Sequence, residues 1–260
     1  MKTILITGAS SGIGNATAKL FAADNNYQLI LCGRRKDRIE LLKNELTTSY
    51  NVAVHTLLFD IRSFVECEEA FKSLPDSFNK VDILLNNAGL ALGLDLIHEG
   101  NLAHWETMID TNIKGLLYMT RIISKGMVER NTGHIINIGS TAGKEVYPKG
   151  NVYCATKFAV DALSRAIRQD LVSFNVRVSQ ISPGHVEETE FALTRFEGDT
   201  EKSKIYQDFN ALKPHDIAEI IYFVANRAAH INIQDILVMG TQQASSTNIN
   251  RSGRIFDERV

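Results

Sequence analysis

Two side chains that could exchange a proton lie four residues apart in a stretch of helical period. Tyr153 and Lys157 occur in VYCATKFAVDALSRAI, and this spacing places them on one face of a helix, a turn apart. A phenol has a pKa near 10, so it acts as an acid or base at neutral pH only if its anion is stabilised. An adjacent ammonium together with a second cation would lower that pKa by about 3, which corresponds to roughly 4 kcal/mol. A chance YxxxK pair is the alternative, so the surrounding residues must decide.

A serine ends a buried apolar run upstream of this pair. The run HIINIG leads directly into Ser140, and open α/β sheets bind ligands where parallel strands end. The Ser140 hydroxyl could hold a substrate carbonyl while Tyr153 protonates it and a hydride arrives from a cofactor. Without the downstream tyrosine, an ordinary turn serine would be the better interpretation.

A glycine-rich turn follows the first apolar run of the chain. In TGASSGIG the glycines are Gly8, Gly12 and Gly14, and a stretch of helical period follows. Gly8 permits the turn, Gly12 lets the backbone approach a pyrophosphate, and Gly14 packs the helix on the sheet, so the helix N-terminus points at phosphates. The spacing GxxxGxG differs from GxGxxG, and an ordinary strand-to-helix turn is the alternative. Its place after the first strand favours a dinucleotide site.

The end of the second predicted strand indicates which dinucleotide binds. A free ribose 2′-hydroxyl, as in NAD, calls for an acid about 20 residues after the loop. The chain has Arg34 and Arg35 there instead, and guanidinium groups pair with phosphate in bidentate fashion. We therefore infer NADP, whose nicotinamide would be the second cation near Tyr153. The alternative is that GRRKDR is merely the solvated start of a helix.

Asn112 falls inside the otherwise amphipathic helical stretch MIDTNIKGLL. Asparagine is a poor helix former because its side chain competes for backbone hydrogen bonds. Either it caps a break in the helix or it serves a chain of water molecules.

The elements that position these residues follow a βαβ rhythm. Short runs rich in Val, Ile and Leu alternate with longer stretches of helical period, and their continuous hydrophobicity suits a sheet covered on both faces. Right-handed crossovers then predict an α/β fold, a Rossmann-type doubly wound sheet of seven parallel strands with helices on both faces. The expected strands are 3–7, 28–32, 53–59, 83–86, 134–138, 177–181 and 236–239.

Two segments break this rhythm. Residues 184–212 form a stretch of loop length typical of lids and binding loops, so we expect a substrate lid there. The polar tail 241–260 has no clear period and is expected to fold, if at all, only against neighbours or a partner subunit. We expect both to belong to a single domain spanning residues 1–260.

Composition excludes several classes of protein. The 260 residues carry 28 Lys+Arg against 30 Asp+Glu with no block of like charge, which argues against a nucleic-acid binder or a polybasic membrane anchor. No apolar run approaches a membrane span or a signal h-region. The three cysteines are widely separated and no HExxH occurs, so we expect neither disulfides nor a catalytic metal, and a reducing cytoplasmic location.

Taken together, the residues resemble the short-chain dehydrogenase/reductase family over essentially the whole chain. TGASSGIG, NNAG at 86–89, Asn112, Ser140, YCATK at 153–157 and a Pro183–Gly184 pair occur in the family's order. The resemblance implies that Tyr153 is the general acid/base and that Lys157 holds the nicotinamide ribose and lowers the tyrosine pKa. It further implies that Ser140 positions the carbonyl and that Asn112 anchors a water and proton relay.

The resemblance also implies how NADP is held. Asp60 would meet the adenine amine, Asn87 with Ala88 the adenosine side, and the backbone after Pro183 the carboxamide. With the loop and the arginines, the expected cofactor contacts are Gly8, Ser10, Ser11, Gly12, Ile13, Gly14, Arg34, Arg35, Asp60, Ile61, Asn87, Ala88, Gly89, Tyr153, Lys157, Pro183, Gly184, Val186 and Thr189.

Finer patterns such as NNAGLALG, GHIINIGSTAG and EFALTRFEGD resemble the NADP-dependent 3-hydroxy acid dehydrogenases, the group that includes serine and L-allo-threonine dehydrogenase. One departure is PGHVEETEF, where a Leu and small residues or a shorter spacing would be usual and this chain has His185, Glu187 and Glu188. The departure puts substrate preference in doubt more than reaction type. A 3-oxoacyl-carrier-protein reductase or general carbonyl reductase is the enzymatic alternative, and a non-catalytic NADP sensor is the alternative from another class.

The expected substrate is a small 3-hydroxy acid or the matching keto acid or semialdehyde. A buried carboxylate must be paired, so the lid should supply a cation. Lys144, Lys149, His185 and Arg195 are the candidates, and Arg195 is favoured because its fork suits a carboxylate, although a solvated surface arginine is the alternative. The resemblance also implies a homotetramer through paired helices around Asn112 and Tyr153.

Overall fold

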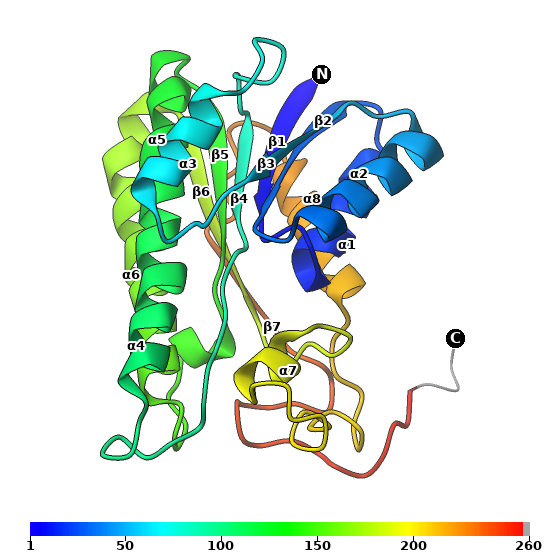
Figure 1. The fold of residues 1–260 in the computed structure, drawn as a ribbon, viewed down its shortest axis with the longest axis vertical. Coiled ribbons are helices and arrows are strands. Elements are labelled where there is room, and N and C mark those ends of the chain that lie inside the picture. Colours follow the sequence, from blue (N-terminus) through cyan, green and yellow to red (C-terminus); the bar gives the residue numbers. More distant parts are fainter. Residues whose placement is uncertain (257–260) are drawn as a thin grey trace.

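The alternating apolar runs form one parallel sheet in this computed structural model, which describes residues 1–256 (Figure 1). Its strand order is β3-β2-β1-β4-β5-β6-β7, and every neighbouring pair is parallel. The predicted doubly wound sheet of seven strands is therefore confirmed. The strands are β1 (Lys2–Thr7), β2 (Tyr27–Gly33), β3 (Val54–Leu58), β4 (Ile83–Asn86), β5 (Gly133–Ile138), β6 (Val176–Pro183) and β7 (Asp235–Val238).

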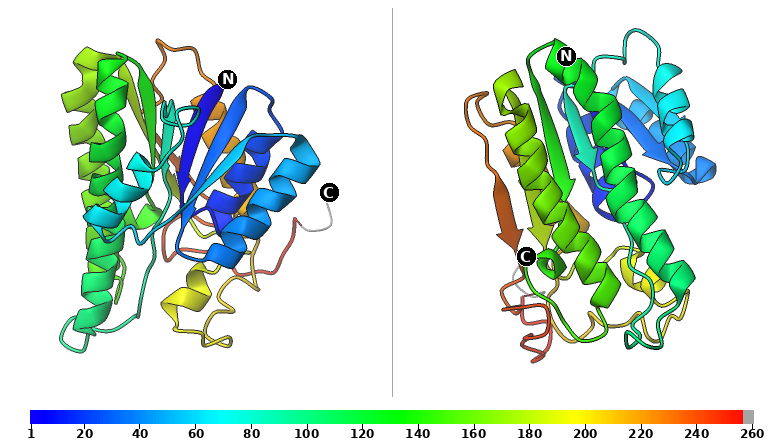
Figure 2. Two further views of the ribbon diagram at one scale, coloured as in Figure 1. Left: turned by 45° about the horizontal axis from the view of Figure 1, so that its top comes forward. Right: turned by 90° about the vertical axis from the view of Figure 1, so that its left-hand side faces the viewer.

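Helices cover both faces of this sheet, as Figures 1 and 2 show. One face packs against α1, α2 and α8, and the other against α3, α5 and α6. The helices are α1 (Gly12–Ala22), α2 (Lys36–Tyr50), α3 (Phe64–Lys72), α4 (Leu102–Ile109), α5 (Leu116–Glu129), α6 (Asn151–Leu171), α7 (Phe191–Arg195) and α8 (Pro214–Ala225). A π-helical turn, η1 (Asp110–Gly115), joins α4 to α5, and short 3₁₀ turns are η2 (Thr141–Gly143) and η3 (Val172–Phe174).

Strand β1 shows why these strands read as continuous apolar runs. Ile4, Leu5 and Ile6 are all fully buried. Ile4 and Ile6 belong to the core on one face of the sheet, whereas Leu5 belongs to the core on the other. Successive side chains of a strand point to opposite faces, so a sheet covered on both sides needs an apolar residue at every position.

The carboxyl ends of the strands meet at the edge of the sheet where the two irregular segments lie. The chain turns in opposite directions from β1, toward β2 on one side and β4 on the other, which creates the crevice that such sheets use for ligands. Residues 184–212 and the tail both gather at this end of the molecule (Figure 1, yellow and red).

The polar tail folds against the chain's own 184–212 segment. Gly253 N–H donates to the Asp208 carbonyl at 3.0 Å. The Gln242 side chain accepts from Asn210 N–H at 2.8 Å and donates to the Gly253 carbonyl at 2.9 Å. The described part of the tail therefore packs against residues of the same chain. Residues 257–260 of the predicted tail lie outside the described residues.

No helix within residues 1–256 is long and apolar enough to cross a membrane. No group of three or more His, Cys, Asp or Glu side chains in this range could hold a metal ion. Cys32, Cys67 and Cys154 are all free and buried.

Candidate active site

A cavity of about 630 Å³ occupies the crevice at the carboxyl ends of the strands. It brings together most of the residues that sequence patterns singled out, although they span nearly two hundred positions. The predicted residues that line it are Gly8, Ser10, Ser11, Gly12, Ile13, Arg34, Arg35, Asp60, Ile61, Asn87, Ala88, Gly89, Ser140, Tyr153, Lys157, Pro183, Gly184, Val186, Thr189 and Arg195. Gly14 and Asn112 lie behind this lining.

The glycine-rich turn has the shape that a pyrophosphate requires. Gly8 and Gly12 have φ angles of +66° and +53°, a region that side chains with a Cβ rarely adopt. A Cβ on Gly14 would lie 2.5 Å from the Gly8 carbonyl oxygen, so this position needs glycine for close packing. The Ser11 side chain accepts no hydrogen bond from the first turn of α1, which leaves those N–H groups directed at the cavity. The turn fits a dinucleotide.

The two arginines after β2 stand at the rim of the same cavity but are held differently. Arg35 donates from Nε and Nη2 to the Ser10 hydroxyl at 3.2 and 2.8 Å, and from Nη2 to the Ser11 hydroxyl at 3.0 Å. Arg34 is more exposed and lies 3.6 Å from the Asp60 carboxylate. This donor set suits a phosphate at the open side of the groove.

Asp60, expected near the adenine, is mainly engaged by Arg62. Arg62 Nε and Nη2 donate to its two oxygens at 3.0 and 2.6 Å. The hydrogen bond from Arg62 is the largest of the causes that hold the pKa of Asp60 below its usual value, although partial burial opposes it. The carboxylate is therefore ionised at neutral pH, and Asp60 also lines the cavity.

Ser140, Tyr153 and Lys157 converge where β5 ends. Ser140 leaves the strand and its hydroxyl accepts from Ala142 N–H at 3.1 Å, which caps η2. Tyr153 and Lys157 are buried on one face of α6, with Lys157 Nζ 6.0 Å from the centre of the tyrosine ring. Lys157 Nζ donates to the Ile138 carbonyl at 3.0 Å. The ammonium is thus anchored to the strand that carries Ser140.

Burial dominates the titration of this pair. It raises the pKa of Tyr153 well above the ordinary value, with a hydrogen bond from Ser140 acting in the opposite direction, and lowers the pKa of Lys157 to about 8. We expected Lys157 to lower the tyrosine pKa, and the described residues by themselves do not produce that result. A phenolate loses more hydration in this enclosed site than the protein charges restore. Without a further cation, Tyr153 is a neutral acid.

Asn112 lies in a π-helical turn that joins α4 to α5 in right-handed helical backbone, so the helix continues through this position and Asn112 does not cap a break. Its Nδ2 donates to the Leu90 carbonyl at 2.8 Å and to the Thr156 hydroxyl at 3.0 Å, and its Oδ1 accepts from Leu90 N–H at 2.9 Å. The side chain thereby ties the loop after β4 to α6 beside Lys157. Both N–H groups of the Asn112 side chain donate within the chain. A proton relay through Asn112 would therefore use its oxygen atoms as acceptors.

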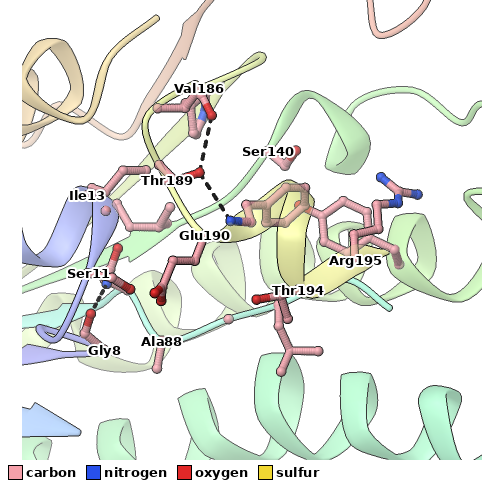
Figure 3. Close-up of a pocket in the computed structure, with 18 of the residues that line it drawn as sticks. Gly8, Ser11, Ile13, Ala88, Ser140, Val186, Thr189, Glu190, Thr194 and Arg195 are labelled. Atoms are coloured by element: carbon pink, nitrogen blue, oxygen red, sulfur yellow. Dashed lines mark hydrogen bonds between the residues drawn. The ribbon is translucent and has the colours of Figure 1, made fainter. Parts of the chain in front are cut away.

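Arg195 is buried against the predicted acid/base. Only 8% of it is exposed, and its guanidinium carbon lies 5.5 Å from the Tyr153 ring centre. Nη1 donates to the Tyr147 hydroxyl at 2.9 Å and Nε to the Gly93 carbonyl at 3.3 Å. Nη2 is buried and has no partner among residues 1–256. Figure 3 places Arg195 at the opposite end of the cavity from Gly8 and Ser11.

The other candidate cations are placed differently. Lys144 forms ion pairs with Asp161 and Asp235, so its charge is already neutralised away from the cavity lining. Lys149 is exposed and belongs to a separate small pocket.

The three unusual residues of PGHVEETEF, which are His185, Glu187 and Glu188, also differ in their surroundings. Glu187 pairs with Arg254 of the tail and Glu188 with Lys213, so neither carboxylate lines the main cavity. His185 does line it, and its ring packs edge-on against Tyr206 and Phe209. Burial lowers the pKa of His185, so the imidazole is neutral at pH 7. Only His185 of the three can contact a ligand there.

Sequence reasoning missed several residues that line the cavity. Tyr147 follows Ser140 closely and its position between Ser140 and Tyr153 could have drawn attention to it. Glu190 and Tyr206 lie in the 184–212 segment, and Arg251 comes from the tail. No local pattern identifies these three, because only the packing of the tail and this segment on the strand ends places them.

Known proteins resemble this chain over nearly its whole length. The family model for short chain dehydrogenases matches residues 2–200. The NADP-dependent 3-hydroxy acid dehydrogenase YdfG of Salmonella typhi is 47% identical over 96% of this chain and 99% of that protein. Sulfoacetaldehyde reductase 2 of Chromohalobacter salexigens is 43% identical over 94% of this chain and 96% of that protein. The closed form of serine dehydrogenase complexed with NADP⁺ has a TM-score of 0.89 and 45% identity, covering 96% of this chain and 99% of that one.

Proposed function

The chain belongs to the short-chain dehydrogenase family and is an NADP-dependent oxidoreductase, and from this premise we propose that it interconverts small 3-hydroxy acids with the corresponding keto acids or semialdehydes. The proposed substrates are serine, L-allo-threonine and acids like 3-hydroxypropionate. The single observation that carries this proposal is the buried guanidinium of Arg195, a residue that lines the same cavity as Tyr153 and Ser140 and whose Nη2 has no partner among residues 1–256.

The residues that would hold NADP are those of the glycine-rich turn, the two arginines after β2 and the loop after β4. Bound NADP supplies the hydride acceptor and NADPH the donor, a chemistry that side chains lack. Lys157 would hold the nicotinamide ribose, where its ammonium also faces the tyrosine ring. The backbone after Pro183 would face the carboxamide.

The chain's own residues would manage the proton. The Ser140 hydroxyl would hold the substrate oxygen at the end of β5 while Tyr153 takes its proton in oxidation and returns it in reduction. Because burial disfavours the phenolate, Tyr153 holds its proton firmly until a positive charge is bound nearby. Asn112 would complete the route by which that proton reaches solvent.

The carboxylate of the substrate would bind Arg195. An unpaired buried N–H is costly, and an anion would satisfy it while the guanidinium offsets the cost of burying the anion. The Tyr147 hydroxyl, which accepts from Arg195 and belongs to a residue that lines the same cavity, would also contact this anion. We propose that residues 184–212 act as the lid that closes over this group.

Two alternatives remain to be distinguished. A 3-oxoacyl-carrier-protein or general carbonyl reductase would turn over substrates without a small anionic head, and an NADP sensor would turn over none. We further propose a homotetramer, and a cytoplasmic location because all three cysteines are free.

A substrate panel tests the function. Purified protein with NADP or NADPH is assayed in both directions with 3-hydroxy acids, with sulfoacetaldehyde and with uncharged alcohols and ketones of matched size. We expect the 3-hydroxy acids or their products to have the highest kcat/KM. Better turnover of uncharged ketones would overturn the substrate class, and better turnover of sulfoacetaldehyde would assign the anion subsite to a sulfonate.

Replacing the guanidinium tests the subsite directly. Arg195→Met should raise KM for 3-hydroxy acids at least tenfold, which corresponds to about 1.4 kcal/mol, and should spare uncharged alcohols. Lys149→Met, an exposed cation outside the cavity lining, is the control and should change neither value. An equal effect of Arg195→Met on both substrate types would remove it from this role.

A further inference from the structure

A carboxylate of the lid binds the arginine that stands at the phosphate end of the cavity. Glu190 precedes α7, and its Oε2 lies 2.6 Å from Arg35 Nη1. Its other oxygen forms an ion pair with Arg38, also at the start of α2. These two contacts join the lid to the opposite wall of the cofactor groove, and Figure 3 shows the Glu190 side chain beside Ser11.

The Arg35 guanidinium is almost fully occupied by these contacts. Its Nε and Nη2 face the hydroxyls of Ser10 and Ser11, and its Nη1 faces Glu190. A phosphate that binds Arg35 in bidentate fashion must therefore replace the serines or the glutamate. A serine hydroxyl can rotate and donate to the incoming phosphate, whereas a carboxylate can only accept and carries the same sign of charge. Glu190 is thus the neighbour of Arg35 whose charge opposes a bound phosphate.

Glu190 is ionised when this competition takes place. Burial acts to raise its pKa, but hydrogen bonds from Arg35 and Arg38 outweigh it and hold the pKa below its usual value. The Glu190 carboxylate and the phosphate are consequently two anions that compete for the guanidinium of Arg35. Two anions bound to the same guanidinium repel each other, and the partial exposure of this ion pair to water weakens that repulsion.

We propose that Glu190 is a cofactor-discriminating residue of the lid, whose carboxylate competes with the ribose 2′-phosphate of NADP for Arg35. A dinucleotide with the 2′-phosphate takes Arg35 from Glu190 and loosens the lid, which keeps the Glu190–Arg38 ion pair, whereas one with a free 2′-hydroxyl leaves both Glu190 contacts in place. The inference rests on NADP as the cofactor and not on the identity of the hydroxy acid.

Binding of cofactor fragments tests the competition without turnover. Adenosine 2′,5′-bisphosphate carries the phosphate in question, and 5′-ADP does not, so calorimetry with each isolates its contribution. Glu190→Gln should bind the 2′,5′-bisphosphate at least fivefold more tightly than the wild type and 5′-ADP within twofold. Glu188→Gln, which removes a charge of the same lid that pairs with Lys213 instead, should match the wild type for both.

Opposite results would identify what is wrong. Unchanged binding of the 2′,5′-bisphosphate by Glu190→Gln would overturn the inference, and weaker binding would overturn it and mean that Glu190 organises Arg35 for the phosphate. Equal binding of the two fragments by the wild type would overturn the choice of NADP itself. Failure of the hydroxy acid panel would leave both binding results unaffected.

Hydrogen exchange tests the release of the lid. In the wild type, saturating 2′,5′-bisphosphate should speed amide exchange in residues 191–209, and 5′-ADP should not. Glu190→Gln should already exchange at the faster rate and should not respond to the bisphosphate, because the contact to be broken is absent. Slower exchange of this segment in the wild type on adding the bisphosphate would refute the release.

Discussion

Tyr153 is the residue on which the proposed proton transfer depends. Tyr153 lies in a buried site. The only ammonium beside it among the described residues is that of Lys157, and burial lowers the pKa of Lys157 to about 8. A cation that binds with the cofactor would therefore act on a phenol that the protein alone keeps neutral. In the proposed mechanism, this arrangement couples proton transfer to cofactor binding.

Replacing the phenol by phenylalanine tests that assignment. Tyr153→Phe should reduce kcat by a factor of about 10²–10⁴, the usual contribution of a general acid/base, and should leave NADPH affinity within threefold because little surface is lost. Steady-state kinetics and a fluorescence titration of NADPH measure the two quantities. A variant that keeps a sizeable fraction of the wild-type rate would mean that the proton comes from another group.

A second buried titratable residue, His134, controls acid stability. Burial lowers its pKa from 6.5 to about 3, and its Nε2 lies 2.8 Å from the Ser179 hydroxyl. Above pH 6.5 the ring is neutral in both states, so its contribution is constant. Below that value the unfolded chain binds a proton that the folded chain refuses, so stability is lost as pH falls from about 6.5 to about 3.

This difference can be measured against a variant that cannot titrate. Between about pH 7 and pH 4.5 the wild type should lose about 2–3 kcal/mol more unfolding free energy than His134→Gln, since the unfolded pKa lies about two pH units above the final value. Denaturant titrations at the two pH values supply the numbers. His98→Gln removes a histidine whose side chain is 72% exposed and should lose as much as the wild type. Equal losses in His134→Gln and wild type would exclude this origin.

Among the elements, the lid depends most on contacts that are distant in sequence. It contains one short helix, α7, and is held by the tail through Gln242, Arg251 and Arg254. The Glu187 carboxylate is mostly buried and meets both terminal nitrogens of Arg254 at 2.7 and 2.8 Å. The tail therefore anchors one side of the lid, while Glu190 anchors the other side to α2.

Cutting the tail contact should loosen the lid. Arg254→Met leaves the Glu187 carboxylate without that partner at a cost of about 1–3 kcal/mol, so trypsin should cleave the lid about tenfold faster. Glu187→Gln combined with Arg254→Met should recover part of the loss because no buried charge is stranded. Lys213→Met breaks the exposed pair with Glu188 and serves as the control. No change in cleavage by Arg254→Met would show that the tail does not anchor the lid.

For the whole molecule, the outer face of α6 indicates assembly. One stripe of the helix covers the sheet, whereas a second stripe of Ala155, Phe158, Ala162 and Ala166 is exposed. Phe158 is 42% exposed, and an exposed apolar stripe of this kind on a helix favours a protein partner. The proposed homotetramer would cover it by pairing equivalent helices.

Light scattering tests the assembly. At micromolar concentration the wild type should have the mass of four chains, and Phe158→Glu should yield smaller species because it would bury like charges across a symmetric contact. Phe223→Glu, an exposed phenylalanine on α8, is the matched control for the pairing of α6. A wild-type monomer would refute the tetramer, and a Phe158→Glu tetramer would exclude α6 as its contact.

Strand positions and the glycine-rich turn could be predicted because their causes are local. Every strand buried on both faces must be apolar at successive positions, as Ile4, Leu5 and Ile6 are, so the pattern is visible in the sequence. Gly8 and Gly12 are recognisable because positive φ angles exclude most side chains. The spacing of Tyr153 and Lys157 within one helix is likewise a local property.

The sequence by itself therefore determined the sheet, the dinucleotide turn and the residues on one helical face, whereas the tertiary structure decided what surrounds them. The titration of Tyr153 depends on how completely the lid and strands exclude water, which no spacing reveals. The partner of Arg35 is Glu190, about 150 residues away in the chain, and that of Arg195 is Tyr147. Such contacts arise when the whole chain packs, because desolvation and ion pairing depend on distance in space.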